Sequence, residues 1–291
     1  MPETHINPHI YDGFHVDASL GDEFDPISAI RSEDPWTAYL GILRACKSGN
    51  FREIGRLPPL MTKTEGYFFW RASTEIIGYA GSWKTISGAF SYFTPRMSNS
   101  DFQYFFASAL GASCSLKAVT PLLQLHQEAE DEEARHQIEN HLAYLLEEED
   151  GPVWDGASQT LDVPDDDNEP LRFVVDRVSY FDVVQKAFRD VAATQSSDTT
   201  PIYEGKTYDV IQLSHRLLDR LRSDDRQFGR INRERVAFEA ATGLDTRSFY
   251  TENGTLLRLP AAAIIEDFLD SGDVNRFRAG QRYFFGHPIP E

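Results

Sequence analysis

The segments EIIGYAGSWKTISGAF (75–90) and SALGASCSLKAVTPLL (108–123) match each other at an offset of 33 residues. Glycine, serine and lysine fall at the same places in both segments, as Gly78 and Gly111, Ser82 and Ser115, and Lys84 and Lys117. Such self-similarity is the signature of a structural repeat. A glycine at one place in both units predicts a helix C-terminus with positive φ.

Helical periodicity surrounds this pair of segments. Apolar residues follow a 3.6-residue period at 102–110, and similar stripes occur at 86–93 and 134–145. Helix breaks are predicted at 78–81, 94–95, 111–115 and 128–132. The pattern predicts helices of about 10 to 16 residues, stacked as hairpins.

Further helical stripes at 171–191, 207–222 and 259–272 follow an acidic interruption. We therefore expect an all-α fold: a helical-hairpin solenoid with a C-terminal helical cap and a short extended tail. The predicted organisation is an acidic N-terminal segment (1–35), repeats (36–147), an acidic loop or linker (148–170) and a C-terminal helical region with a capping tail (171–291).

The stretch ALGASCSLKAVTPLLQLHQEAEDEEARHQI (109–138) resembles HEAT-like repeats, in particular the short type found in phycobilisome lyases. The resemblance rests on Ala-Leu-Gly at 109–111, on Val119 and Pro121 at a helix start, and on Asp131 and Arg135. It covers about 70–147 and implies a HEAT-like solenoid. It also implies that Asp131 and Arg135 are structural, because this acid and arginine join adjacent units in such repeats.

Charge is strongly negative and unevenly placed. The net charge is −18, and residues 128–169 hold sixteen acids against one base, Arg135. This balance disfavours nucleic acid as a partner and favours a basic protein, with simple solubility as the alternative explanation. Residues 216–235 carry seven arginines interleaved with four acids. Their spacing predicts a salt-bridged helical face rather than a phosphate-binding groove.

Composition predicts a cytoplasmic protein. The start of the chain lacks the basic and apolar regions of a signal peptide, and no apolar run approaches the length needed to span a bilayer. The two cysteines, Cys46 and Cys114, are too few for a disulfide framework. We expect no membrane partner, and we expect Cys114 to be a small buried residue in a turn.

The polar residues form no recognisable catalytic or metal-binding motif. His126, His136 and His141 share one acidic region, but His136 and His141 are five residues apart and do not share a helix face. We interpret the three as solvated helix side chains. The chain has no nucleophile elbow and no phosphate-binding glycine motif. The prediction is a non-enzymatic protein with no catalytic residues, no cofactor and no metal.

The C-terminal stretch 241–290 resembles the end of HEAT-like immunity proteins from bacterial polymorphic-toxin systems. The matching residues are Thr242-Gly243, Phe249-Tyr250, Ala261–Ile265 and Arg282–Pro288. The resemblance implies a cytoplasmic protein that binds and neutralises a cognate toxin through its acidic surface, the toxin being a basic domain such as a nuclease. The alternatives are a HEAT-like lyase or other cofactor-handling enzyme, and a general protein-binding scaffold.

Candidate partner-binding residues come from the acidic loop and from the tail GQRYFFGHPIPE (280–291). They are Glu147, Glu148, Glu149, Asp150, Asp165, Asp166, Asp167, Glu169, Arg282 and His287. In the tail, the aromatic residues 283–285 are predicted to pack and to cover the end of the repeat stack. Arg282 and His287 are either hydrogen-bonded structure or a partner contact.

Overall fold

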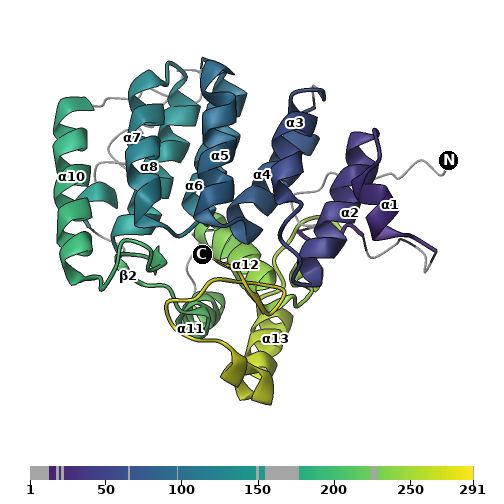
Figure 1. The fold of residues 1–291 in the computed structure, drawn as a ribbon. Helices are drawn as coiled ribbons and strands as arrows, with labels where there is room; N and C mark the ends of the chain where they lie inside the picture. Colours follow the sequence, from purple (N-terminus) through teal and green to yellow (C-terminus); the bar gives the residue numbers. More distant parts are fainter. Residues whose placement is uncertain are drawn as a thin grey trace. The chain divides into compact units, whose positions relative to one another are not determined.

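The computed structural model describes residues 13–17, 20, 23–64, 66–96, 98–148, 151–154, 177–223 and 228–290. Over this part the chain is mostly helical, with two short β-hairpins (Figure 1). The all-α expectation is therefore confirmed at the level of fold class. The chain divides into two compact units: unit 1 comprises Met1–Phe69 and Asp209–Pro290, and unit 2 comprises Trp70–Tyr208.

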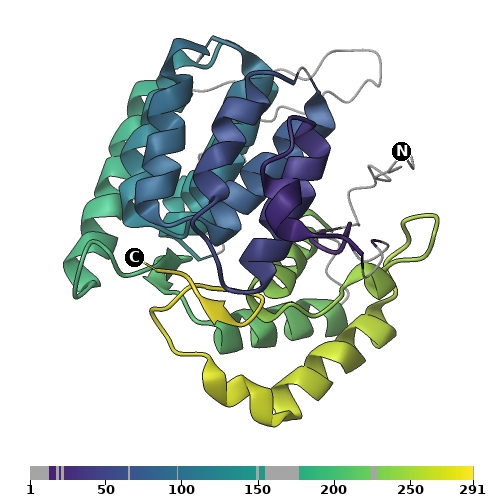
Figure 2. The same cartoon turned by 45° about the vertical axis from the view of Figure 1, so that its right-hand side comes forward.

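Unit 1 joins the two ends of the chain. Its N-terminal elements are α1 (Pro26–Ile30), α2 (Pro35–Lys47), the 3-10 turn η1 (Ile54–Arg56), α3 (Leu57–Met61) and the first residues of α4 (Tyr67–Ala80). Its C-terminal elements are α11 (Val210–Arg222), α12 (Phe228–Thr242), η4 (Arg247–Phe249), α13 (Arg258–Asp270), η5 (Gly272–Arg276), β3 (Tyr283–Phe284) and β4 (His287–Pro288). Helix α13 lies beside α11 (Figure 2). Phe268 of α13 packs edge-to-face on Phe238 of α12.

Unit 2 holds the rest of α4 and a series of antiparallel helices. They are α5 (Trp83–Phe93), η2 (Thr94–Arg96), α6 (Ser100–Ala112), η3 (Leu116–Ala118), α7 (Val119–Glu128), α8 (Glu132–Leu146) and α10 (Arg177–Thr194), followed by β1 (Ile202–Tyr203) and β2 (Lys206–Thr207). Phe93, Phe102 and Phe106 are fully buried and pack on one another with ring centroids 4.6 to 5.7 Å apart. Burial of these three rings contributes strongly to the stability of this part of the unit.

The predicted helix breaks coincide with helix ends in unit 2. Three of these helices begin at a side chain that makes the usual N-cap hydrogen bond. Ser82 caps α5, Asn99 caps α6 and Asp131 caps α8, with oxygen-to-nitrogen distances of 3.3, 3.0 and 2.8 Å. Arg135 is buried and donates to the carbonyl of Ala129 (2.7 Å), which ties the start of α8 to the end of α7. Both residues are therefore structural within the α7–α8 pair, and the expectation that they join adjacent repeat units stays a prediction.

The repeated glycines have a different role from the one predicted. Gly78 and Gly111 lie inside α4 and α6, and neither has positive φ. A Cβ atom on Gly78 would lie 2.8 Å from the carbonyl oxygen of Ala109 in α6, and one on Gly111 would lie 2.4 Å from Nδ1 of His141 in α8. Each glycine lies in the last turn of its helix, as predicted, but it lets another helix approach closely and the prediction of a positive φ was wrong.

The two hairpins dock on helix ends in the same way. Both turns have two successive residues with positive φ, which a type I′ turn requires: Glu204 and Gly205 in one, Phe285 and Gly286 in the other. In the first turn the two N–H groups donate to the last-turn carbonyls of α8, at 2.8 and 2.9 Å. In the second turn they donate to those of α12, at 2.7 and 2.8 Å. Each hairpin thus satisfies carbonyls that a helix end leaves unpaired.

The tail is a hairpin and not a simple extended strand. Tyr283 and Phe284 are buried in unit 1, with 6% and 0% exposure, so the expected packing of the tail aromatics is confirmed for these two. Phe277 packs edge-to-face on Tyr283 at 4.9 Å, and the Tyr283 hydroxyl accepts the N–H of Arg278 (3.0 Å). The prediction missed the hairpin because the Phe285-Gly286 pair was not recognised as its turn.

Candidate functional site

The structure describes the acidic loop only where it leaves α8. Glu147 and Glu148 belong to the described part of the chain. Six of the predicted partner-binding residues lie outside the described residues: Glu149, Asp150, Asp165, Asp166, Asp167 and Glu169. Among the acidic candidates, the structure therefore shows contacts only for Glu147 and Glu148, which follow the end of α8 in unit 2.

Glu147 holds the start of the loop in place. Its Oε2 atom accepts the N–H of Val153 (2.7 Å), and its carbonyl accepts the indole N–H of Trp154 (3.2 Å). Val153 is fully buried, and the Trp154 ring packs edge-to-face on Tyr144 at 4.7 Å. Glu147 is thus largely a structural residue, whereas Glu148 is exposed and forms an ion pair with Lys206 of β2.

A second group of carboxylates lies at the α7–α8 turn. Five acidic side chains are exposed there, and we call them the turn acids: Glu128, Glu130, Asp131, Glu132 and Glu133. Asp131 caps α8, and Glu128 accepts the side-chain amide of Gln124 (3.1 Å). The sequence signal was present, because all five belong to the acidic run 128–169, but they were not predicted to bind a partner.

The two acidic groups stand at opposite ends of one helix. The turn acids lie at the N-terminus of α8, and Glu148 lies just beyond its C-terminus. The fifteen residues of α8 span about 22 Å. This separation exceeds the screening length of physiological salt, which is about 8 Å. The turn acids and Glu148 therefore act as separate charged patches.

Arg282 and His287 belong to the tail hairpin of unit 1. The backbone carbonyl of Arg282 accepts the side-chain amide of Gln281 (2.8 Å) and the N–H of Ile289 (2.9 Å). His287 is exposed, and its ring lies over Gly49, where a Cβ atom would approach Nδ1 to 2.9 Å. Both residues thus take part in the structure of the hairpin, and the imidazole of His287 also faces solvent.

Two of the three histidines of the acidic region are buried, contrary to the prediction that they are solvated. Nε2 of His126 (3% exposed) is hydrogen-bonded to Oε1 of the fully buried Glu139 at 2.7 Å. The Tyr180 ring of α10 lies 5.0 Å from that of His126, and burial followed by the charge of Glu139 raises the pKa of Tyr180 well above 10. His141 bonds to Ser108 (3.2 Å). The prediction failed because periodicity does not identify which polar side chain has a buried partner.

These groups join neighbouring helices. His136 Nδ1 lies 4.0 Å from Oε2 of Glu139, on the same carboxylate that His126 contacts. Within the described ranges, no group of three or more histidine, cysteine, aspartate or glutamate side chains has an arrangement that fits a metal ion. The Glu139 carboxylate thus joins α8 to α7, and Tyr180 joins α10 to both through the His126 ring and the backbone carbonyl of Glu139.

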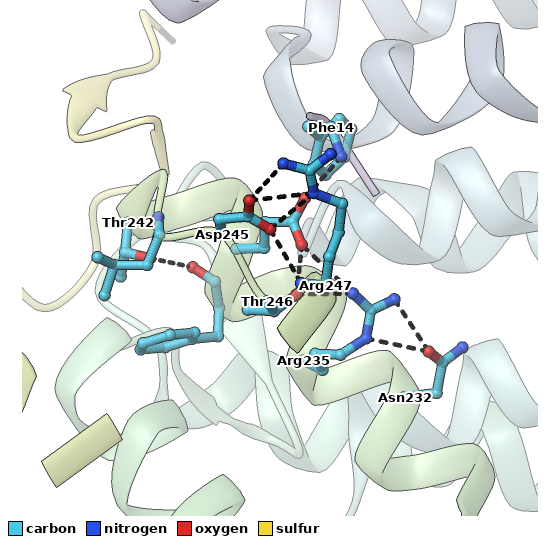
Figure 3. A network of polar contacts seen from close by, with 10 residues as sticks. Phe14, Asn232, Arg235, Thr242, Asp245, Thr246 and Arg247 are labelled. Carbon is cyan, nitrogen blue, oxygen red and sulfur yellow. Dashed lines mark hydrogen bonds and ion pairs between the residues drawn. The ribbon is translucent and has the colours of Figure 1, made fainter. Parts of the chain in front are cut away.

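A buried polar cluster in unit 1 centres on Arg235 and Glu239 of α12. Figure 3 shows Arg235 with its neighbours Asn232 and Thr246. Both side chains have 0% exposure, and they form an ion pair of 3.3 Å. Arg235 also donates to Thr246 (2.7 Å) and, through Nε and Nη2, to Oδ1 of Asn232 (3.2 and 3.1 Å). Salt bridging was predicted for this arginine-rich segment, but on a helix face rather than in the core.

The Glu239 carboxylate has a donor on each oxygen. Oε1 accepts the backbone N–H of Phe14 (2.6 Å), and Oε2 accepts the hydroxyl of Thr246 as well as Arg235. Burial raises the pKa of Glu239, while Arg235 and the hydrogen bonds from Thr246 and Phe14 offset part of that rise. A second buried ion pair joins α11 to α12, between Arg220 and Glu234 at 3.1 Å.

Both cysteines are buried. Cys46 is fully buried, and burial raises its pKa to about 12. Cys114 is also buried and lies in the turn after α6 with a φ of 50°. Its carbonyl accepts the N–H of Ile202 (2.6 Å), so it joins this turn to β1. The prediction of a small buried residue in a turn is confirmed for Cys114.

Comparison with protein-family models, with curated proteins and with solved structures finds no match for the chain. The resemblance to HEAT-like repeats and to immunity proteins therefore stays a prediction. Among the described residues, none of the helices combines the length and the apolar character that crossing a bilayer requires.

Proposed function

We propose that the chain is a non-enzymatic immunity protein that binds a cognate bacterial toxin in the cytoplasm and neutralises it. The proposed fold is a HEAT-like solenoid with a C-terminal helical cap, and the proposed partner is a basic toxin domain such as a nuclease. One observation supports the proposal best: the five turn acids are exposed together on a helical support.

Electrostatics supports a basic partner in particular. The chain carries a net charge of −18, and exposed carboxylates repel nucleic acid phosphates while attracting a basic surface. Complementary charge accelerates association and selects against wrong partners. A toxin that binds nucleic acid presents such a basic surface, and occupation of that surface by carboxylates would block its substrate.

The proposal is tested by co-expression with the toxin domain. The C-terminal domain encoded by the gene directly upstream is expressed with and without this chain, and growth and co-purification are measured. We expect restored growth and a stable complex. Absence of both with every neighbouring gene product would refute the proposal, and binding of a bilin with release of a modified phycobiliprotein would favour the lyase alternative.

A matched pair of variants locates the surface. Glu130→Gln, Glu132→Gln and Glu133→Gln together remove three charges from the turn acids. Asp267→Asn, Asp270→Asn and Asp273→Asn remove the same charge from exposed positions of α13 and η5 in unit 1. We expect the first triple variant to lose protection in cells at low expression and the second to keep it, because local charge and not total charge selects the partner.

A further inference from the structure

The first described residues form a strap across unit 1. We call Gly13–Asp17 the N-terminal strap. It is attached at two points: the N–H of Phe14 donates to Glu239 of α12 (2.6 Å), and Asp17 pairs with Arg44 (3.4 Å) and Lys47 of α2. The strap therefore joins a helix from the N-terminal part of the chain to one from the C-terminal part.

The strap fills a site that fits it closely. Phe14 has 0% exposure, and its ring packs edge-to-face on Phe284 (5.1 Å) and Phe285 (6.5 Å) of the tail hairpin. Gly13 has a φ of 51°, and a Cβ atom there would lie 2.1 Å from Oε1 of Glu239. Only glycine allows the backbone to enter so close to the carboxylate.

His15 lies at the centre of the strap with an unpaired ring nitrogen. Its ring is 5.3 Å from that of Phe285, and its Nε2 atom is buried with no hydrogen-bond partner among the described residues. A neutral imidazole with its proton on Nδ1 tolerates this position, because the unbonded Nε2 then carries only a lone pair and no N–H donor. An imidazolium there would hold a buried N–H donor without an acceptor, which is costly.

Four charged groups lie near enough to His15 to affect its pKa, while the tail hairpin meets it with the uncharged Phe285 ring. They are Lys47 from α2, Asp17 from the strap itself, and Asp245 and Arg247 from the region of η4. Arg247 and Asp245 pair with each other at 2.6 Å, so their charges partly cancel. Lys47 pairs with Asp17, and its ammonium also lies 4.7 Å from the centre of the Phe285 ring, beside His15.

We propose that the N-terminal strap is an acid-released latch: protonation of His15 frees the strap from unit 1 and exposes the aromatic site that Phe14 fills. Burial, followed by the charge of Lys47, lowers the pKa of His15 below 6.5. The unfastened strap binds the proton more tightly than the docked strap. Docking is therefore fully stable above the pKa of a free histidine, weakens as the pH falls below that pKa, and reaches its full loss below the lowered value.

Hydrogen exchange at the Phe14 amide measures the latch directly. Exchange of the whole chain is followed near pH 7.5 and near pH 5.5, and each rate is divided by the intrinsic rate for that pH. We expect the protection of Phe14 to fall about three-fold or more on acidification. In His15→Gln the change should disappear, because glutamine does not titrate. His215→Gln, at an exposed position of α11, is the control and should behave as the unchanged chain.

Two results would overturn the proposal. One is an equal loss of Phe14 protection in the unchanged chain and in His15→Gln. The other is a His15 titration, followed by its imidazole resonances in the unchanged chain, whose midpoint is not below the pKa of a free histidine. The second measurement needs no variant, so it decides the matter even if His15→Gln does not fold.

Discussion

At the scale of single residues, substitution of glycine by alanine should have opposite effects on stability in α5 and in the helices α4 and α6. Alanine favours a helix over glycine by about 1 kcal/mol. We expect Gly88→Ala in α5 to stabilise unit 2 by about that amount, because nothing lies within 4 Å of the added Cβ atom. Gly78→Ala and Gly111→Ala should instead destabilise it by about 1–3 kcal/mol, because the added methyl meets the neighbouring helix.

Urea unfolding followed by circular dichroism checks these three variants. Opposite signs for Gly88→Ala and Gly111→Ala would support helix contact at the repeated glycines. A stabilising Gly111→Ala would mean that α8 does not approach α6 closely at this glycine.

The buried ion pair of α12 predicts a pH-dependent stability. Arg235→Met leaves the Glu239 carboxylate buried without its cation, which costs about 3–5 kcal/mol near pH 7. The pKa of Glu239 is already raised by burial, and it rises further without Arg235. A carboxyl group whose pKa is raised on folding binds protons more tightly in the folded state. The variant should therefore recover part of its stability as the pH falls.

The measurement is the free energy of unfolding of Arg235→Met relative to the unchanged chain, near pH 7 and near pH 5. Arg222→Met removes an arginine whose ion pair with Glu266 is exposed, and its effect should be about 0–1 kcal/mol at either pH. The same loss for Arg235→Met at both pH values would contradict a charged, buried Glu239.

Residue roles were predictable from the sequence where a local pattern carries them. The structural role of Asp131 was predicted from its place in the repeat pattern, and this residue caps α8. His126 and Glu139 were not identified as partners, because they come from different helices thirteen residues apart. The role of Gly111 was misjudged for a similar reason: what requires glycine there is His141 in a later helix.

At the scale of elements, the two hairpins predict a difference between two similar substitutions. Gly205 and Gly286 both have positive φ, which costs an alanine about 1–2 kcal/mol. At Gly205 the added Cβ atom would also lie 2.5 Å from the backbone carbonyl oxygen of Leu146, which cannot move freely. At Gly286 it would meet the guanidinium of Arg276, a flexible side chain. Gly205→Ala should thus be the more damaging.

Thermal unfolding of both variants checks the comparison. We expect a melting temperature lowered by a few degrees in Gly286→Ala and by about twice as much in Gly205→Ala. Equal shifts would mean that the β1–β2 hairpin is not held against the end of α8 by its turn.

The hairpins also limit what could be predicted for elements. Long helices with an apolar stripe were located well, because their periodicity is repeated over several turns. Each strand has only two residues, too few for an alternating pattern. The sequence signal for each turn is one pair of residues, Glu204-Gly205 or Phe285-Gly286. Glycine readily adopts the positive φ that a type I′ turn requires, but glutamate and phenylalanine do not. Tertiary contacts with a helix end hold the glutamate or the phenylalanine in place.

At the scale of the whole molecule, the net charge was the most predictable property. The roles of the individual carboxylates were the least predictable. The net charge and the acidic run follow directly from the sequence, and the turn acids are exposed as such a run predicts. Which carboxylates face solvent and which are structural depends on contacts. Glu147, chosen as a partner-binding candidate, holds Val153 and Trp154, whereas the turn acids were not chosen.

Charge predicts how a complex with a basic partner would respond to salt. Neutralising the turn acids, or the candidates Asp165, Asp166 and Asp167, removes the long-range electrostatic attraction that steers a basic partner toward this chain. Association should slow, and its dependence on ionic strength should become weaker. Dissociation should change little, unless a neutralised side chain lies inside the interface.

The most direct measurement is the association rate constant of the purified chain with the toxin domain proposed as its partner, over ionic strengths from about 0.05 to 0.3 M. It compares the unchanged chain, the Glu130, Glu132 and Glu133 triple variant, and the Asp267, Asp270 and Asp273 control. We expect the first triple variant to associate about ten-fold more slowly at low salt, with a flatter salt dependence, and the control to stay within about two-fold of the unchanged chain. Equal rates for both triple variants, or no complex at all, would contradict an acidic toxin-binding surface at the turn acids.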